Sequence, residues 1–213
     1  MLSLFQKGGI FMYAILGVSI VSFALFCERF SFLYLRLKLN TDKALQKIMI
    51  FLEKMNYHSA IEECTKIEKH PLGRILKAGL LKSDKRDKEI EMAMEEHILK
   101  EIPLIKTRVN YLAMFANIAT LLGLLGTIMG LITAFQGVSN ASAAMKQEIL
   151  AKGISMAMFT TAFGLLVAIP CLAGYYILNN RGDYLIDQFE AKALSLYNIL
   201  CSLKRDREKL CLD

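Results

Sequence analysis

The sequence has very little charge between residues 109 and 180, where only Lys146, Glu148 and Lys152 are charged and histidine is absent. These three residues lie together, between two runs that carry no charge at all. At the depth of a bilayer core the chain therefore offers no acid, base or histidine. Any ion chemistry inside the membrane needs an ionisable group from another chain.

Motifs for catalysis and metal binding are also missing. The three histidines (His58, His70 and His97) are scattered, and we expect them on helix surfaces. Glu95-Glu96-His97 lacks the second histidine of the H-E-x-x-H zinc motif. No C-x-x-C pair, phosphate-binding loop or nucleophile-and-base arrangement occurs. We therefore expect no enzyme activity, no cofactor and no metal site. The cysteines are odd in number and far apart, and free thiols are expected at Cys27, Cys64, Cys171, Cys201 and Cys211.

Three long apolar runs are present instead, at 8–27, 109–145 and 153–180. Each reaches the roughly 20 residues that a helix needs to cross the hydrocarbon core. The first run is an alternative candidate for a secretory signal, but only Lys7 precedes it and no A-x-A site ends it. Phe26 also stands before Cys27, where a lipoprotein needs a small residue. The sequence therefore predicts an all-α integral membrane protein with three transmembrane helices.

Basic residues predict the topology, because they concentrate on the cytoplasmic side of membrane proteins. They are most abundant in 28–108 and 181–213, which should then share that side. Segment 28–108 mixes acids with its bases, a pattern that does not favour nucleic-acid binding. The predicted order is a periplasmic N-terminus (1–9), transmembrane helix 1 (10–28), a cytoplasmic helical segment (29–108), transmembrane helix 2 (109–135), a periplasmic loop (136–152), transmembrane helix 3 (153–179) and a cytoplasmic C-terminal helix (180–213).

The spacing of apolar residues that is typical of a helix continues beyond the three apolar runs. We expect one continuous helix over about 87–135, kinked by Pro103, and a third helix that continues to about Leu203. Long second and third helices would thus extend from the membrane into the cytoplasm.

Small residues recur at intervals of four in the second and third runs. In lipid, helices associate where small side chains let their backbones approach. The stripes predict close helix packing, most simply within an oligomer. Their members are Gly123, Gly126, Gly130 and Ala134 in the second run, and Gly153, Ala157, Thr160, Gly164 and Ala168 in the third.

A few polar residues accompany these stripes. A threonine hydroxyl in a helix often bonds a carbonyl of its own helix, so each one alone is as consistent with structure as with function. Several on facing helices favour a weakly polar lumen or a surface for a partner helix. Pro170 either kinks its helix or leaves a carbonyl free for water or a partner. The candidates for the lumen or partner-facing surface are Asn117, Thr120, Thr127, Met156, Thr160, Thr161 and Pro170.

The three membrane runs, in order, resemble the MotA/TolQ/ExbB proton-channel family, and within it ExbB and TolQ. The matching segments are GGIFMYAILGVSIVSFALFCERF (8–30) with its Glu28-Arg29 pair, LLGLLGTIMGLITAF (121–135) and GISMAMFTTAFGLLVAIP (153–170). Thr127 and Thr161 match lumen threonines of the family, and Thr160 stands where many relatives have alanine. Met156 departs from the pattern, because many relatives have glutamate there.

The resemblance implies a pentamer in the bacterial inner membrane, with its N-terminus periplasmic and its C-terminus cytoplasmic. Spans two and three would surround an ExbD/TolR-like single-span partner that carries an intramembrane aspartate. Proton flow would then energise a TonB- or TolA-like transducer, as in TonB-dependent outer-membrane transport. Alternatives are a TolQ-like role in envelope integrity, a non-conducting scaffold, and a flagellar stator like MotA, which usually has four spans.

Overall fold

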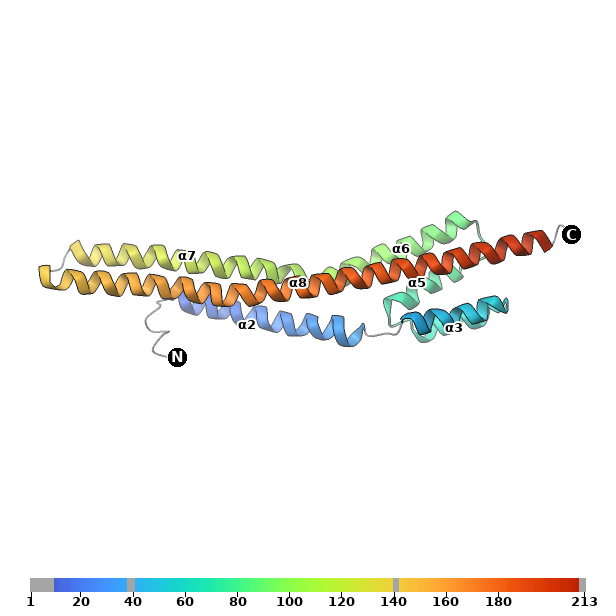
Figure 1. Cartoon of the computed structure of the whole chain (residues 1–213), viewed down its shortest axis with the longest axis horizontal. Coiled ribbons are helices and arrows are strands. Elements are labelled where there is room, and N and C mark those ends of the chain that lie inside the picture. The colour runs from blue at the N-terminus through green and yellow to red at the C-terminus, as the bar shows by residue number, and fades with distance from the viewer. Residues whose placement is uncertain (1–9, 38–40, 140–141, 211–213) are drawn as a thin grey trace. The chain divides into compact units, whose positions relative to one another are not determined.

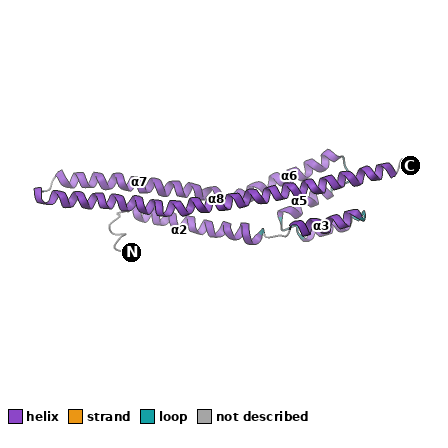
Figure 2. Cartoon of the chain, in the orientation of Figure 1, coloured by secondary structure: helices purple, strands orange, loops and turns teal. Residues whose placement is uncertain are grey.

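Helices make up nearly all of the structure, a computed structural model that describes residues 10–37, 41–139 and 142–210 (Figures 1 and 2). The predicted N-terminal segment 1–9 and Cys211 lie outside these residues. The elements are α2 (Ile10–Ser31), the π-helix η1 (Phe32–Arg36), α3 (Thr41–Glu53), α4 (Tyr57–Lys66), α5 (Pro71–Leu80), α6 (Asp87–Lys106), α7 (Val109–Ser139) and α8 (Ala143–Leu210). The prediction of an all-α chain is confirmed.

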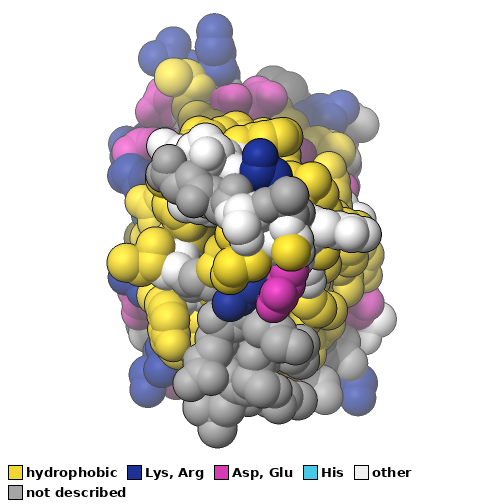
Figure 3. Space-filling model, turned by 90° about the vertical axis from the view of Figure 1, so that its left-hand side faces the viewer, with side chains coloured by type: hydrophobic (Ala, Val, Ile, Leu, Met, Phe, Trp, Pro, Cys, Tyr) yellow, Lys and Arg dark blue, Asp and Glu magenta, His cyan; other side chains and the backbone are white. Residues whose placement is uncertain are grey.

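The contacts divide the chain into two compact units. The first contains α2, α7 and α8 as far as Asn179, and the second contains η1, α3 to α6 and α8 from Asn180. Three helical stretches are long and apolar enough to cross a membrane, and they include α2, α7 and the first part of α8. The candidate spans are therefore the helices of the first unit. Figure 3 shows hydrophobic side chains on one face of the chain together with Lys, Arg, Asp and Glu side chains.

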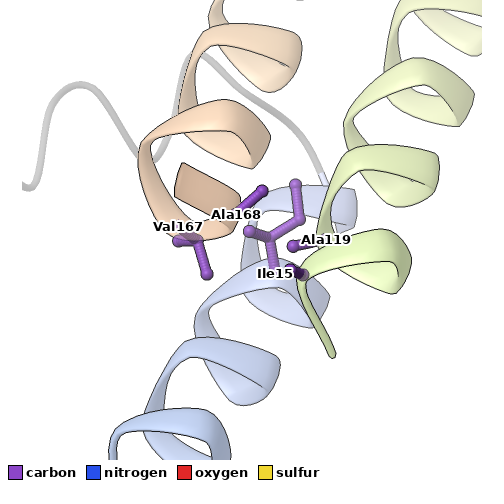
Figure 4. Close-up of a cluster of buried hydrophobic side chains, with 5 residues drawn as sticks. Ile15, Ala119, Val167 and Ala168 are labelled. Carbon is purple, nitrogen blue, oxygen red and sulfur yellow. The ribbon is translucent and has the colours of Figure 1, made fainter. Parts of the chain in front are cut away.

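The core of the first unit joins all three of its helices. Ile15 of α2 packs among Ala116 and Ala119 of α7 and Val167 and Ala168 of α8 (Figure 4). All five side chains are buried, and four of them are at most 2% exposed. The three alanines of α7 and α8 leave room for Ile15 of α2 between the two helices, and partly buried side chains such as Val18 and Phe163 pack against the cluster.

Close approach of α7 to α8 depends on glycine. A Cβ added at Gly126 would lie 2.7 Å from Thr160 Oγ1, and one added at Gly164 would lie 2.7 Å from the carbonyl oxygen of Ala119. A Cβ at Gly130 would meet the Cβ of Ala157 at 3.0 Å. Two further glycines of the stripes also lie at this contact: Gly123 faces Thr161 and Gly164, and Gly153 faces Ala134. The stripes thus hold α7 to α8 within one chain.

The second unit has an apolar core and one bidentate ion pair. Leu72, Ile75 and Leu76 of α5 are fully buried. Arg74 Nε and Nη2 donate to the two carboxylate oxygens of Glu101 at 2.6 and 2.7 Å, and the Glu101 residue is 5% exposed. The pKa of Arg74 is raised, chiefly by its hydrogen bond to Glu101. This geometry satisfies a carboxylate that would otherwise be costly to bury.

His70 differs from its prediction as a surface residue, because it is only 7% exposed. Its Nδ1 accepts a hydrogen bond from the backbone N–H of Leu72 and so caps α5, whose first residue is Pro71. Its ring makes an edge contact with Phe189 of α8, with centroids 5.5 Å apart. Burial lowers the pKa of His70. The cap position, which depends on Pro71 starting a helix, explains why the residue lies inside.

Two predicted boundaries also differ from the structure. The helix expected over 87–135 is interrupted: α6 ends at Lys106, Thr107 donates to the Pro103 carbonyl, and Arg108 has a positive φ of 66°. A left-handed residue cannot continue an α-helix. The loop expected over 136–152 is much shorter, because α7 continues to Ser139 and α8 begins at Ala143. The charged residues that separate the two apolar runs led to the prediction of a loop, but such residues can also lie in a helix. The expected continuation of the third helix to about Leu203 is confirmed, since α8 reaches Leu210.

Candidate functional site

The centre of the candidate site is a pair of threonine hydroxyls, one from α7 and one from α8. The Oγ1 atoms of Thr127 and Thr161 are in hydrogen-bond contact with each other. Thr127 Oγ1 lies 3.0 Å from the carbonyl oxygen of Gly123, and Thr161 Oγ1 lies 3.1 Å from the same oxygen. Gly123 permits this arrangement, since a Cβ there would be 3.3 Å from the Cα of Thr161. Both threonines are half-buried, so the pair remains accessible from one side.

The pair has more acceptors than protons. The two hydroxyls supply two protons. Each hydroxyl has the other hydroxyl and the Gly123 carbonyl as possible acceptors, and Thr161 also has the Ala157 carbonyl at 3.5 Å. Each hydroxyl can donate one hydrogen bond and accept two. The pair can therefore donate to an approaching carboxylate and accept from a protonated carboxyl group. Neither hydroxyl titrates in the physiological range, so the pair cannot itself store a proton.

Thr160, the neighbour of this pair, lies between the helices. It is 1% exposed, its Oγ1 donates to the Ala157 carbonyl at 2.8 Å, and its side chain faces Gly126. Met156 is half-buried, and its carbonyl is 3.4 Å from Thr160 Oγ1. Within one chain these contacts favour a packing role for Thr160.

The other predicted polar residues do not join the pair. Asn117 and Thr120 are exposed on α7, and Thr120 Oγ1 donates to the carbonyl of Ala116 in its own helix at 3.0 Å. Pro170 is exposed on α8 and lines a cavity shared with α2. The structure thus brings Thr127 and Thr161 together and leaves Asn117, Thr120 and Pro170 at other places on the unit.

One ion pair at the end of α2 was not predicted. Glu28 accepts from Arg108 Nη1 at 2.5 Å and lies 3.9 Å from Arg29. The sequence singled out Glu28-Arg29, but Arg108 reaches Glu28 only because the chain turns between α6 and α7. The positive φ at Arg108 has no clear signature in the sequence. This ion pair joins α2 to the start of α7.

Comparison with known proteins agrees with this architecture. The family model described as the MotA/TolQ/ExbB proton channel family matches residues 67–191. A putative biopolymer transport protein, ExbB-like 3, of Synechocystis is 30% identical over 168 residues, covering 78% of this chain and 79% of the relative. A putative ExbB homologue of Methanothermobacter thermautotrophicus is 29% identical, and the match covers 89% of this chain and 66% of that relative's length.

A solved structure shows the same fold. The structure of C. jejuni MotAB superposes with a TM-score of 0.67 over 92% of this chain and 79% of that chain, at 18% sequence identity. The family model matches more than half of the chain and includes α7 and most of α8, which contain the threonine pair. The chain therefore belongs to the MotA/TolQ/ExbB proton channel family.

Proposed function

We propose that this chain is a subunit of a bacterial inner-membrane complex that is driven by the proton-motive force. Its partner would be an ExbD/TolR-like protein whose single span contains an aspartate. Proton movement along the interface would drive motion of the complex and energise a TonB- or TolA-like transducer. Each proton that crosses makes available about 2.3 kcal/mol per 100 mV.

The threonine pair is the observation that supports this proposal. The pair is half-buried, and its hydroxyls bond each other and the Gly123 carbonyl. The same hydroxyls can also form hydrogen bonds to a carboxyl group, whether that group is protonated or ionised. Since α7 and the first part of α8 lack an ionisable side chain near it, the proton carrier has to come from the partner. The absence of glutamate at position 156 agrees with a proton carrier on the partner and hydrogen-bonding hydroxyls on this chain.

The proposed assembly is a pentamer with the N-terminus in the periplasm and the C-terminus in the cytoplasm. The distribution of basic residues supports the orientation. The small-residue stripes are used between α7 and α8 of one chain, so subunits would meet through other surfaces. Apolar side chains remain exposed on both helices, among them Leu124 and Ile128 of α7 and Met158 and Leu165 of α8.

Proton uptake by vesicles tests the proposal. The chain would be co-expressed with an ExbD/TolR-like single-span protein of the same organism, reconstituted, and energised by a potassium diffusion potential, with an internal pH dye as the readout. Uptake should require both proteins and should fall to background when the partner's membrane aspartate is replaced by asparagine. Unchanged flux after that replacement would exclude a proton carrier on the partner.

A non-conducting scaffold is the second candidate function. One observation favours it: Thr120, Thr127, Thr133 and Thr160 all donate to a carbonyl of their own helix, a sufficient structural role for a membrane threonine. The vesicle experiment separates the two candidates, because a scaffold gives no partner-dependent uptake.

A choice between an ExbB-like and a TolQ-like role depends on which transducer the complex energises, and co-purification with a TonB- or TolA-like protein would identify it.

A further inference from the structure

Arg181 lies where the apolar part of α8 ends. The run 153–180 contains no charged residue, and α8 passes through it into Arg181 without a break. This run belongs to one of the three helical stretches that are long and apolar enough to cross a membrane. The first charged residue after such a run lies at the level of the lipid headgroups, whichever side of the membrane it faces.

Two tyrosine rings hold the Arg181 guanidinium. Its central carbon is 5.2 Å from the ring centroid of Tyr34, in η1, and 5.3 Å from that of Tyr184, in α8. All three residues belong to the second unit. A cation within about 6 Å of an aromatic centroid is attracted to the face of the ring. The two rings therefore fix the position of the guanidinium.

No acid pairs with Arg181 among the residues that the structure describes. Its Nε is buried without a hydrogen-bond partner, and its two Nη groups also lack one but are not buried. Asp183 lies two residues further on and pairs with Lys106 at 2.8 Å. Residues two apart in a helix do not face each other. Arg181 thus presents unused N–H donors in a fixed orientation.

A second donor lies beside the guanidinium. Tyr184 is three residues after Arg181, and so on the same face of α8. It is 53% exposed, and its hydroxyl has no hydrogen-bond partner within the described part of the chain. A guanidinium can bind two oxygens of one phosphate, and a tyrosine hydroxyl can donate to a third. Every phospholipid places a phosphate at this level of the membrane.

We propose that Arg181 and Tyr184 bind the phosphate of a phospholipid headgroup, with the rings of Tyr34 and Tyr184 orienting the guanidinium. The contact would fix the depth of α8 in the bilayer at the point where the helix leaves the hydrocarbon. The threonine pair takes no part in it, so the proposal is independent of proton transport.

Lipid binding to the full chain provides the test. The chain would be purified in an uncharged detergent and stripped of lipid, and native mass spectrometry would measure its binding of dioctanoyl phosphatidylglycerol. Dioctanoylglycerol is the second probe, because it has the same acyl chains and no phosphate. Glycerol phosphate is the soluble competitor, because it has the phosphate and no acyl chains.

The unsubstituted chain should bind phosphatidylglycerol at least about tenfold more tightly than dioctanoylglycerol, the effect of about 1.4 kcal/mol. Arg181→Gln should abolish this preference. Arg36→Gln is the matched control and should keep it, because Arg36 is exposed at the end of η1 and contacts no ring among the described residues.

Tyr184→Phe tests the site without removing the arginine or a ring. It deletes one exposed hydroxyl, so the fold should be unaffected. Binding of phosphatidylglycerol should weaken by about two- to tenfold, the range for one neutral hydrogen bond. Binding of dioctanoylglycerol should not change.

Three results would overturn the proposal. Equal binding of the two lipids by the unsubstituted chain would show that no phosphate is recognised, as expected if an acid of a second copy pairs with Arg181. Displacement of phosphatidylglycerol by an equal concentration of glycerol phosphate would identify a soluble phosphate as the ligand. Equal losses in Arg181→Gln and Arg36→Gln would show that any positive charge at this level suffices.

Discussion

Thr127 of α7 and Thr161 of α8 bring their hydroxyls into contact beside the carbonyl oxygen of Gly123, which both can use as an acceptor. The contact exists because a glycine at 123 lets the two backbones approach, so packing and polar chemistry depend on the same position. A pair with two protons and spare lone pairs can adjust its hydrogen bonds to a carboxyl group that gains or loses a proton. That adjustment is the contribution we assign to this chain.

Gly126→Leu should destabilise the first unit. A side chain there would collide with Thr160, whose Oγ1 would be 2.7 Å from the new Cβ, and α7 and α8 would have to separate. Overpacking of this kind costs about 1–3 kcal/mol. The measurement is the midpoint of thermal unfolding in detergent, with size-exclusion chromatography as a check on assembly.

Gly17→Leu is the matched control for this change. Gly17 lies in α2, and nothing is within 4 Å of a Cβ added there. Its midpoint should not fall below the unsubstituted value, because leucine forms helix more readily than glycine. Equal midpoints for the two leucine variants would refute the argument that α7 and α8 need small residues at their contact.

Glu101→Gln should weaken the second unit, because Glu101 is 5% exposed and forms both hydrogen bonds with Arg74. The neutral amide has only one acceptor oxygen for the two N–H groups, and Arg74 loses its counter-charge. We expect a loss of about 2–3 kcal/mol, below the full cost of breaking a buried pair because Arg74 is partly exposed. Chemical denaturation of the purified chain measures it.

The comparison variant is Glu96→Gln. Glu96 pairs with Lys100 at 2.5 Å, but both side chains are mostly exposed. Solvent screens such pairs, so this variant should unfold almost as the unsubstituted chain does. Similar losses for the two variants would mean that the Arg74–Glu101 pair contributes no more than a surface contact.

Acid should destabilise the second unit through His70. Burial lowers the pKa of His70 in the folded chain, so the unfolded chain binds a proton first as the pH falls. The associated stability is fully present above the ordinary histidine pKa of about 6.5 and declines as the pH falls from there toward the lower folded pKa. His70→Asn keeps a side chain that can cap α5 and removes the titrating ring.

A pH series of unfolding midpoints provides the measurement. Between pH 7 and 5 the His70→Asn variant should lose less stability than the unsubstituted chain. His58→Asn changes an exposed histidine and should leave the decline in place. The interpretation of His70 as a buried neutral cap fails if both variants show the same decline.

Much of the architecture was predictable from the sequence, and the reasons are physical. Long uncharged runs favour membrane helices, and small residues at intervals of four mark where helices approach, as Gly126 and Gly130 do. The turn at Thr107 and Arg108 was not predictable, because its positive φ is stabilised by contacts such as Arg108 with Glu28, far apart in sequence. The burial of His70 likewise depends on Phe189, which comes from another helix.

The candidate site was predicted only in part, because spacing along one helix fixes a face but not its neighbour. Thr127 and Thr161 were expected on facing helices, and they do meet. Thr160 was expected beside them in a lumen, yet within the chain it faces Gly126 and is almost fully buried. Which adjacent threonine points inward depends on the rotation of α8, which the sequence pattern does not specify.

Partner-dependent proton uptake by the double variant Thr127→Val/Thr161→Val tests the central claim most directly. Valine keeps the shape of threonine and removes both hydroxyls. Thr133→Val is the control, because Thr133 is exposed on α7 and donates only to carbonyls of its own helix. In vesicles that hold equal amounts of assembled complex, we predict that the double variant loses at least about tenfold in uptake, the effect of roughly 1.4 kcal/mol, and that the control keeps its rate. Full uptake by the double variant would contradict the account.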